Sequence, residues 1–362
     1  LTFSPRFYDN SQNLYQGEYR KVNKNSNHTI DFSIKNKNPF ILDNNSTKTH
    51  FFSESSFYPQ INIFEDSKIE VKLQSVSDEK YLKNFKINSP IIDSETTLNS
   101  QIKFEGSKKD SELTISTEIY EDLTKEDNND KYEIILPNYN YVKSLSLLNL
   151  DGLIEFNSFG YNKLYNTNVN EKIVVNDLSY KSLDKISNLG FISNYEFLFK
   201  NFNSDSSNST SLKNNFENTF QGIVQFNTKI PMVKEGKSLK STFTPILAAK
   251  FNPGSTKNLK NEDRFIDYTN IFSVNRISSN QSLEGGASIT LGSEYKMYNK
   301  SDATDPIFQI NLATSLRDEV NEDLPIKSSL GQKISNIVGE SNIKINQFLD
   351  LDYSFLADNN LG

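Results

Sequence analysis

Few side chains in this sequence have the types and spacing that catalysis or metal binding requires. The chain has two histidines, His28 and His50, and neither has a partner at a spacing that defines an acid–base pair or a metal site. Both lie in polar stretches, so we expect surface histidines. Asp127-Asn-Asn-Asp130 offers oxygen ligands, but it lacks the glycine and the bidentate glutamate of an EF-hand loop. We therefore interpret it as a solvated loop.

Two further groups of residues have an ordinary structural explanation. Asp350 and Asp352 lie two apart in a segment that alternates like a strand, so both carboxylates share one face. They could form an acid–base pair, but a wet lumen or a solvent face is the interpretation we favour. Gly285-Gly286 lacks the flanking residues of a phosphate loop and fits a bulge or a strand start. With no G-x-S-x-G motif either, we expect no enzyme, no cofactor and no metal site.

The composition narrows the class of protein. Hydrophobic residues are 35% of the 362 residues, below the usual soluble share, while aromatic residues at 12% argue against disorder. A net charge of -7 without a basic stripe argues against nucleic acid as a partner. No run approaches the ~18 apolar residues of a membrane helix. A helical membrane protein is thus excluded, but a β-barrel is not, because its strands need only alternate.

Alternation of apolar and polar residues recurs along the chain and predicts strands with two different faces. The segments 30–35 and 69–74 alternate cleanly, and 102–119 predicts a hairpin with its turn at Gly106–Asp110. We predict a single strand over Ile343–Phe355, with polar residues on one parity: Lys344, Asn346, Asp350 and Asp352. Further strands are predicted at Tyr132–Leu136, Leu153–Phe159, Lys172–Leu178, Phe191–Phe202, Phe220–Lys229, Ser241–Phe251 and Ile307–Ser315.

The connections between these strands favour a membrane barrel. Some are short, and others are long and polar: Ser77–Ser89, Glu121–Asp130, Asn203–Glu217, Gly254–Asp263 and Tyr298–Asp305. Tight turns on one rim and long loops on the other are typical of such barrels. A closed barrel leaves no unpaired backbone edge in hydrocarbon, and it needs fewer apolar residues than a dry core. Alternation alone nevertheless leaves a soluble β-rich protein about equally open.

Short strings along most of the chain resemble one family, the outer-membrane LPS-assembly proteins (LptD family). The most telling block is Asn270–Arg276 with Leu283–Tyr295. The other strings occur in the same order and spacing as in the family: Leu1–Arg6, Leu14–Arg20, Val174–Leu178, Phe243–Ile246, Asn252–Gly254 and Ser335–Gly339. In the last string Asn336 stands where the family usually has aspartate.

The resemblance implies a fold, a location and partners. The fold would be all-β, a large antiparallel transmembrane β-barrel in the outer membrane of a Gram-negative cell. Residues 1–362 would be an incomplete barrel from the second strand onward, with the periplasmic jelly-roll domain and the last strands outside it. Lipopolysaccharide would arrive over a periplasmic Lpt bridge, and an LptE-like lipoprotein would fill the lumen.

The resemblance also implies a mechanism and its residues. Lipopolysaccharide would leave sideways into the outer leaflet through a seam between the first and last strands. Pro5 matches the proline that weakens pairing in the second strand, because proline has no N–H to donate. Lys344, Asn346, Asp350 and Asp352 would face the lumen. Two alternatives remain open: another outer-membrane barrel, such as a porin or ligand-gated transporter, or a soluble β-rich surface protein.

Overall fold

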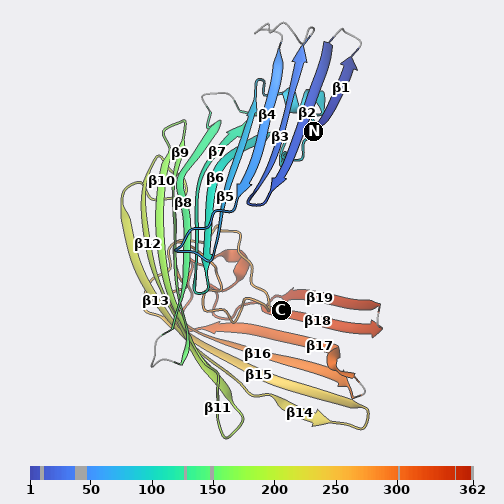
Figure 1. The fold of residues 1–362 in the computed structure, drawn as a ribbon. Helices are drawn as coiled ribbons and strands as arrows, with labels where there is room; N and C mark the ends of the chain where they lie inside the picture. The colour runs from blue at the N-terminus through green and yellow to red at the C-terminus, as the bar shows by residue number, and fades with distance from the viewer. Residues whose placement is uncertain are drawn as a thin grey trace. The chain divides into compact units, whose positions relative to one another are not determined.

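The computed structural model describes residues 1–8, 12–36, 47–125, 129–146, 151–300, 302–346 and 348–359. Within these ranges the chain is all-β, with one large sheet of 19 strands, the short helix α1 (Tyr81–Phe85) and the 3-10 helix η1 (Ile326–Ser328) (Figure 1). Every register described is antiparallel. No register joins the first strand to the last in this part of the chain, so the sheet is not closed. No described helix is long and apolar enough to cross a membrane.

Backbone contacts divide the chain into two compact units. Unit 1 comprises residues 1–143, 157–174 and 203–218. Its first eight strands pair in sequence order: β1 (Thr2–Tyr8), β2 (Gln12–Asn23), β3 (Ser26–Asn36), β4 (Lys48–Phe57), β5 (Asp66–Val76), β6 (Thr97–Lys108), β7 (Ser111–Asp122) and β8 (Tyr132–Leu145).

Unit 2 comprises residues 144–156, 175–202 and 219–362. It holds β11 (Lys185–Ile186), β14 (Met232–Glu235), β15 (Leu239–Asn252), β16 (Gly286–Asn299), β17 (Asp302–Arg317), β18 (Ile337–Asn346) and β19 (Leu349–Ala357). Five strands contribute residues to both units: β8, whose last two residues belong to unit 2, β9 (Gly152–Tyr165), β10 (Asn170–Ser182), β12 (Ile192–Ser207) and β13 (Glu217–Lys229).

The predicted strands are all present, and three of their boundaries are corrected. The hairpin over 102–119 exists, but β6 continues through Gly106 and leaves a turn of only Lys109 and Asp110. Tyr298–Asp305 is not a long loop, since β16 ends at Asn299 and β17 begins at Asp302. Ile343–Phe355 is not one strand either: β18 and β19 form a hairpin across it. The sequence does mark that turn: Gln347 and Phe348 interrupt the alternation, although no glycine or proline stands there.

In unit 1 the exposed face of the sheet is the apolar one. Registers place Phe32 opposite Phe51, and Val71 opposite Ile102, on one continuous face. Phe32 is 45% exposed, whereas its neighbour Asp31 on the other face is fully buried. This polarity is the reverse of a soluble sheet, where the apolar face packs against the core.

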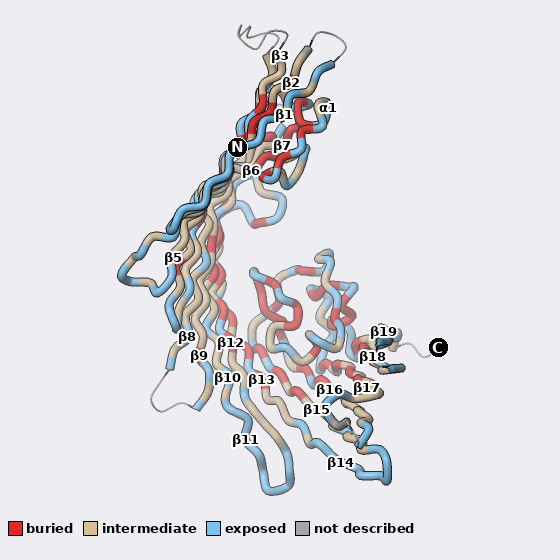
Figure 2. The backbone as a smooth tube through the Cα atoms, turned by 45° about the vertical axis from the view of Figure 1, so that its right-hand side comes forward, coloured by how far each residue is buried: buried red, intermediate tan, exposed pale blue. Residues whose placement is uncertain are grey.

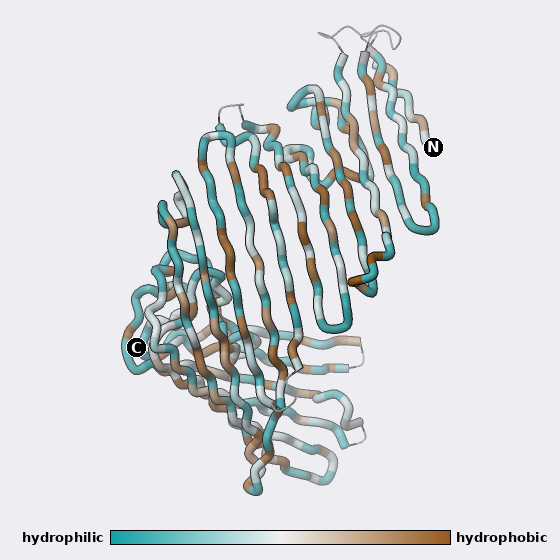
Figure 3. Tube along the Cα trace, turned by 60° about the vertical axis from the view of Figure 1, so that its left-hand side comes forward, coloured by the Kyte–Doolittle hydropathy of each residue, from teal (hydrophilic) through white to brown (hydrophobic). Residues whose placement is uncertain are grey.

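Unit 2 repeats the same reversal. Leu291 is 43% exposed, whereas Thr290, on the opposite face of β16, is only 2% exposed. Leu247 opposes Leu291 on the exposed face. Alternate brown and teal positions along the strands follow this pattern (Figure 3). Phe32 of segment 30–35 and Leu351 of segment 343–355 are each exposed within their own unit, which agrees with strands that have lipid on one face.

Inserted segments cover the polar face in each unit. In unit 1, residues 77–96, including α1, bury a cluster against the sheet: Leu14, Phe52, Tyr81, Leu82, Ile87, Ile91, Leu98 and Leu123. In unit 2, residues 253–285 and 318–336 bury a second cluster: Leu259, Ile266, Ile271, Ile277, Ala313, Leu324, Leu330 and Val338. Buried stretches coincide with these segments (Figure 2). Two of the polar loops expected from the sequence thus fold back, because apolar residues are interspersed in them.

Candidate functional site

Pro5 lies in strand β1. It pairs with Tyr15 of β2, and the flanking rings of Phe3 and Phe7 lie 6.1 Å and 6.5 Å from the ring of Tyr15. The one register described for β1 is with β2. Because Pro5 has no N–H, one position of this strand cannot donate to a neighbour. Aromatic packing therefore has a larger share in holding β1 than it has in a strand with a full set of donors.

The β18–β19 hairpin carries the four predicted polar residues. Lys344 opposes Asp350, and Asn342 opposes Asp352, so these side chains share one face. Through the register of β17 with β18 this face continues the polar face of unit 2. Asn342 donates to Oδ1 of Asp352 at 2.7 Å, which marks that carboxylate as a hydrogen-bond acceptor and not as half of an acid–base pair.

The other two contacts complete the hairpin. Nζ of Lys344 donates to Oδ2 of Asp305 at 3.2 Å. Asn346 lies beyond a register irregularity, and its Oδ1 accepts from the backbone N–H of Phe348 at 2.8 Å. Lys344, Asp350 and Asp352 thus lie together, while Asn346 closes the turn.

His50 is not a surface residue, contrary to the expectation from its polar surroundings. Its side chain is buried, with Nδ1 at 2.5 Å from Oγ of Ser33 and Nε2 at 3.5 Å from Oδ1 of Asp31. Ser33 also contacts the hydroxyl of Tyr81 at 2.7 Å. Burial raises the pKa of Tyr81 to about 12, so that hydroxyl stays protonated. The contacts of Ser33 with His50 and with Tyr81 attach α1 to the sheet. Ser33 is buried, so it is not accessible to a substrate.

The other metal and acid–base candidates give no site in the described ranges. His28 contacts Oγ of Ser55 and of Ser26, both at 3.0 Å, with no carboxylate beside it. Asp127 lies outside the described residues. No group of three His, Cys, Asp or Glu side chains that could hold a metal ion occurs in the part of the chain that is described.

The most elaborate polar site lies under segment 253–285 in unit 2. Arg276 donates from Nε to Oε2 of Glu284 at 2.6 Å and from Nη2 to Oε1 at 2.5 Å. Its remaining donors reach three strand hydroxyls on β16 and β17: Thr290 at 2.9 Å, Ser315 at 2.8 Å and Ser288 at 3.0 Å. The Arg276 side chain is fully buried. A bidentate pair of this kind is among the stronger hydrogen-bonded contacts in proteins.

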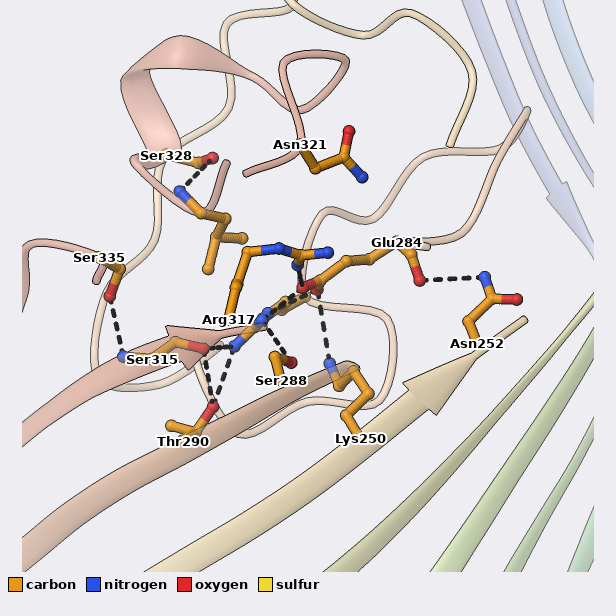
Figure 4. A network of polar contacts seen from close by, with 12 residues as sticks. Lys250, Asn252, Glu284, Ser288, Thr290, Ser315, Arg317, Asn321, Ser328 and Ser335 are labelled. Carbon is orange, nitrogen blue, oxygen red and sulfur yellow. Dashed lines mark hydrogen bonds and ion pairs between the residues drawn. The ribbon is translucent and has the colours of Figure 1, made fainter. Parts of the chain in front are cut away.

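Two more cations complete this cluster (Figure 4). Arg317 of β17 donates to Glu284 and to the carbonyl oxygen of Gly285. Nζ of Lys250 lies 3.8 Å from Oε2 of Glu284 and donates to the carbonyl oxygen of Ser273 at 2.8 Å. Burial alone would raise the pKa of Glu284, but Arg276, Lys250 and Arg317 outweigh it and lower that pKa to about 2. Glu284 is therefore ionised at neutral pH. Its negative charge attracts Arg276, Arg317 and Lys250, whose positive charges outnumber it.

Neutral hydrogen bonds fix the ends of the same segment. Asn252 donates to the carbonyl oxygen of Glu284 at 3.0 Å, and Thr256 accepts from the N–H of Gly285 at 2.8 Å. Gly285 leaves no room for a side chain, because a Cβ there would collide with Gly254. Gly286 has φ +86 and begins β16, which confirms the strand start expected for this glycine pair.

Sequence reasoning missed the roles of Lys250, Glu284 and Arg317, and identified Arg276 only as part of a string. A signal was present: Lys250 and Arg317 fall on the polar parity of their strands. Their burial could not be read from that parity, since it depends on where segment 253–285 folds. The side chains of the cluster are buried and hydrogen-bonded to one another, so the cluster holds segment 253–285 to the sheet.

An open antiparallel sheet with its apolar face exposed and its polar face lined by ionic anchors defines a partial transmembrane β-barrel. The family model LptD, "LPS transport system D", matches residues 56–361. The chain belongs to the LptD family, and lipopolysaccharide transport is the function of that family. The match begins after β1 and so does not include Pro5.

Two other comparisons add little. The search of curated proteins finds no match. Among solved structures, the chain is similar to a "Bacterial polysaccharide outer membrane secretin", with 5% identity over 95% of this chain and 87% of that chain. The TM-score of 0.28 is too low to support any argument.

Proposed function

We propose that this chain forms the wall of an outer-membrane translocon that inserts lipopolysaccharide into the outer leaflet through a lateral seam of the barrel, next to β1. The observation that carries the proposal is the reversed polarity of the sheet, in which apolar residues are exposed and polar residues are covered. Lipopolysaccharide, like the sheet, has an apolar side and a polar side: its acyl chains and its anionic saccharide. A wall with lipid on one side and water on the other can keep each part in its preferred solvent.

The edge strand supplies the opening step of the proposed mechanism. Separating two strands requires that their ladder bonds break together, and each such bond left unpaired in hydrocarbon costs several kcal/mol. Pro5 removes a backbone donor from β1. A seam that includes this position therefore opens at a lower free-energy cost than the same seam with an N–H donor there.

The remaining parts of the proposal concern partners and chemistry. Lys344, Asn346, Asp350 and Asp352 face a water-filled lumen, where they offer hydrogen bonds to saccharide or to an LptE-like lipoprotein. A periplasmic Lpt bridge delivers the lipid, and outer-membrane lipid surrounds the wall. No covalent bond is made or broken, so the protein needs no catalytic residue and no cofactor.

Site-specific photocrosslinking in cells with the full-length protein tests the proposal. A photoreactive residue in place of Phe7, an exposed ring of β1, is expected to capture lipopolysaccharide during its export. The matched control replaces Phe251, an exposed ring of β15, and is expected to capture bulk phospholipid. Equal capture of lipopolysaccharide at the two positions, or capture at Phe251 alone, would contradict a seam at β1.

A further inference from the structure

A pocket of about 280 Å³ lies on the polar face of unit 2, beside segment 253–285. Its size is near the lower end of ligand pockets, roughly 300 Å³, which suits one or two small rings. The lining residues come from β10, β12, β13, β15, β16, the β10–β11 connection and the inserted segment, and they include Asn194, Glu196, Lys229, Tyr268, Phe272 and Glu294.

The floor of this pocket is the sheet itself. Lys229 opposes Ile246, which opposes Gly292, and Glu294 lies two residues further along β16 on the same face. On the adjacent strands, Nδ2 of Asn227 donates to Oδ1 of Asn194 at 2.9 Å and to Oε1 of Glu196 at 3.2 Å. Amide and carboxylate groups thus line the floor from three strands, β12, β13 and β16.

Two aromatic side chains form the wall. The rings of Tyr268 and Phe272 lie 5.7 Å apart at an interplanar angle of 76°, and both side chains are half-buried. The hydroxyl of Tyr268 donates to Oε1 of Glu294 at 3.2 Å. Nε2 of Gln225 donates to the carbonyl oxygen of Phe272 at 2.7 Å, which fixes the segment that carries both rings. The wall is therefore organised before any ligand arrives.

The charges decide which ligand suits the pocket. Three carboxylates line it, from Asp184, Glu196 and Glu294, against two ammonium groups, from Lys181 and Lys229. Lys181 is already paired with Glu196 at 2.8 Å. A phosphate would meet a net negative lining and gain little from Lys229 alone. Carboxylate and amide oxygens instead accept hydrogen bonds from hydroxyl groups.

We infer that this pocket binds a neutral sugar ring of the saccharide that the protein transports. The C–H face of a sugar is apolar and can lie against Tyr268 or Phe272, while its hydroxyl groups donate to Glu196, Glu294 and Asn194. The inference rests on the proposed function for the source of the saccharide. It excludes the phosphorylated part of the lipid from this pocket, which assigns the site to the saccharide chain.

Calorimetric titration of the full-length protein in detergent micelles tests the inference. The probe is saccharide released from the host cell's lipopolysaccharide and freed of lipid and phosphate. Tyr268→Ala is expected to weaken its binding about tenfold, which corresponds to about 1.4 kcal/mol, and Glu196→Gln about fivefold, which corresponds to about 1 kcal/mol. Tyr295→Ala, which removes a ring from the opposite face of β16, is the matched control and is expected to leave binding unchanged.

Three outcomes would overturn the inference: no binding of the neutral saccharide to wild-type protein, equal losses in Tyr268→Ala and Tyr295→Ala, or tighter binding of the phosphorylated saccharide. Folding of the variants is checked by retained heat-modifiable migration in gels. If wild-type cells export lipopolysaccharide and Tyr268→Ala keeps full saccharide affinity, the pocket assignment fails while the proposed function stands. If crosslinking at Phe7 fails but saccharide binds as expected, the proposed position of the seam is wrong and the pocket assignment stands.

Discussion

Arg276 and Glu284 form a buried bidentate ion pair, with Nε to Oε2 at 2.6 Å and Nη2 to Oε1 at 2.5 Å. Both residues belong to segment 253–285, so the pair closes the segment on itself. The other donors of Arg276 reach hydroxyl groups of β16 and β17. The guanidinium of Arg276 therefore joins the segment to the sheet, and the carboxylate of Glu284 makes the burial of that guanidinium favourable.

Removing that carboxylate should release the segment. Glu284→Gln leaves Arg276, Arg317 and Lys250 buried without an anion, and breaking a buried pair in this way costs about 3–5 kcal/mol. We expect faster hydrogen exchange over residues 254–283, measured by mass spectrometry on the protein in micelles. Exchange in unit 1 should stay unchanged.

An exposed ion pair in the same segment provides the control. Arg264 donates from Nε to Glu262 at 3.1 Å, and both side chains are more than a third exposed. Such pairs contribute about 0–1 kcal/mol, so Glu262→Gln should leave exchange as in the wild type. Similar acceleration in both variants would mean that Glu284 is no special anchor.

The ion pairs that Glu284 makes with Arg276, Arg317 and Lys250 should also be lost at low pH. The folded pKa of Glu284 is lowered to about 2 from an ordinary 4.5, so its stabilisation is complete above about pH 4.5 and is lost as the pH falls toward about 2. Exchange over residues 254–283 should accelerate in this window, after correction for the intrinsic rate. Glu284→Gln should lack this acceleration of exchange. If the exchange rate of the wild type depended on pH in the same way as that of the variant, ionised Glu284 would not be the anchor.

Unit 1 depends on apolar packing of its own inserted segment. Leu82 of α1 is fully buried in the cluster with Leu14 and Phe52. Leu82→Ala should destabilise the unit by about 2–5 kcal/mol, which denaturation in micelles can measure. Ile63 lies in the exposed β4–β5 connection, and Ile63→Ala should change stability by less than about 0.5 kcal/mol.

Pro5 should matter for transport more than for folding. Pro5→Ala restores an N–H to β1, strengthens its pairing and should slow lipopolysaccharide delivery, with lower surface lipopolysaccharide and greater detergent sensitivity. Pro245 lies within β15 and opposite Ser293, far along the chain from any seam, so Pro245→Ala serves as the strand-proline control. Normal surface levels and normal detergent resistance in Pro5→Ala would remove the proposed role.

The alternation of residue types was sufficient to predict most strands, because each strand meets two different environments. Segments such as 30–35 and 69–74 lie inside the observed β3 and β5. The β18–β19 turn was missed, because the alternation breaks only at Gln347 and Phe348 and no glycine or proline marks the turn. The prediction that Lys344, Asp350 and Asp352 share one face is nevertheless confirmed, since the hairpin brings Lys344 opposite Asp350.

The buried sites were beyond sequence reasoning for a different reason. His50 and Asp31 are neighbours on the paired strands β4 and β3, and residues 77–96 bury them, whereas Arg276 and Glu284 reach Arg317 because segment 253–285 folds back over the polar face. A polar residue on a strand has the same pattern whether water or another segment covers it. Only the position of the covering segment decides between an exposed side chain and an anchor.

Site-directed spin labelling tests most directly whether the two faces of the sheet meet different solvents. The chain has no cysteine, so single cysteines can be introduced at neighbouring positions of both units: Ile102 and Lys103, and Leu351 and Asp352. In lipid vesicles we predict that labels at Ile102 and Leu351 respond to oxygen dissolved in the bilayer, and those at Lys103 and Asp352 to a water-soluble nickel complex. Equal response of both neighbours to the aqueous reagent, in each pair, would contradict a lipid-facing wall.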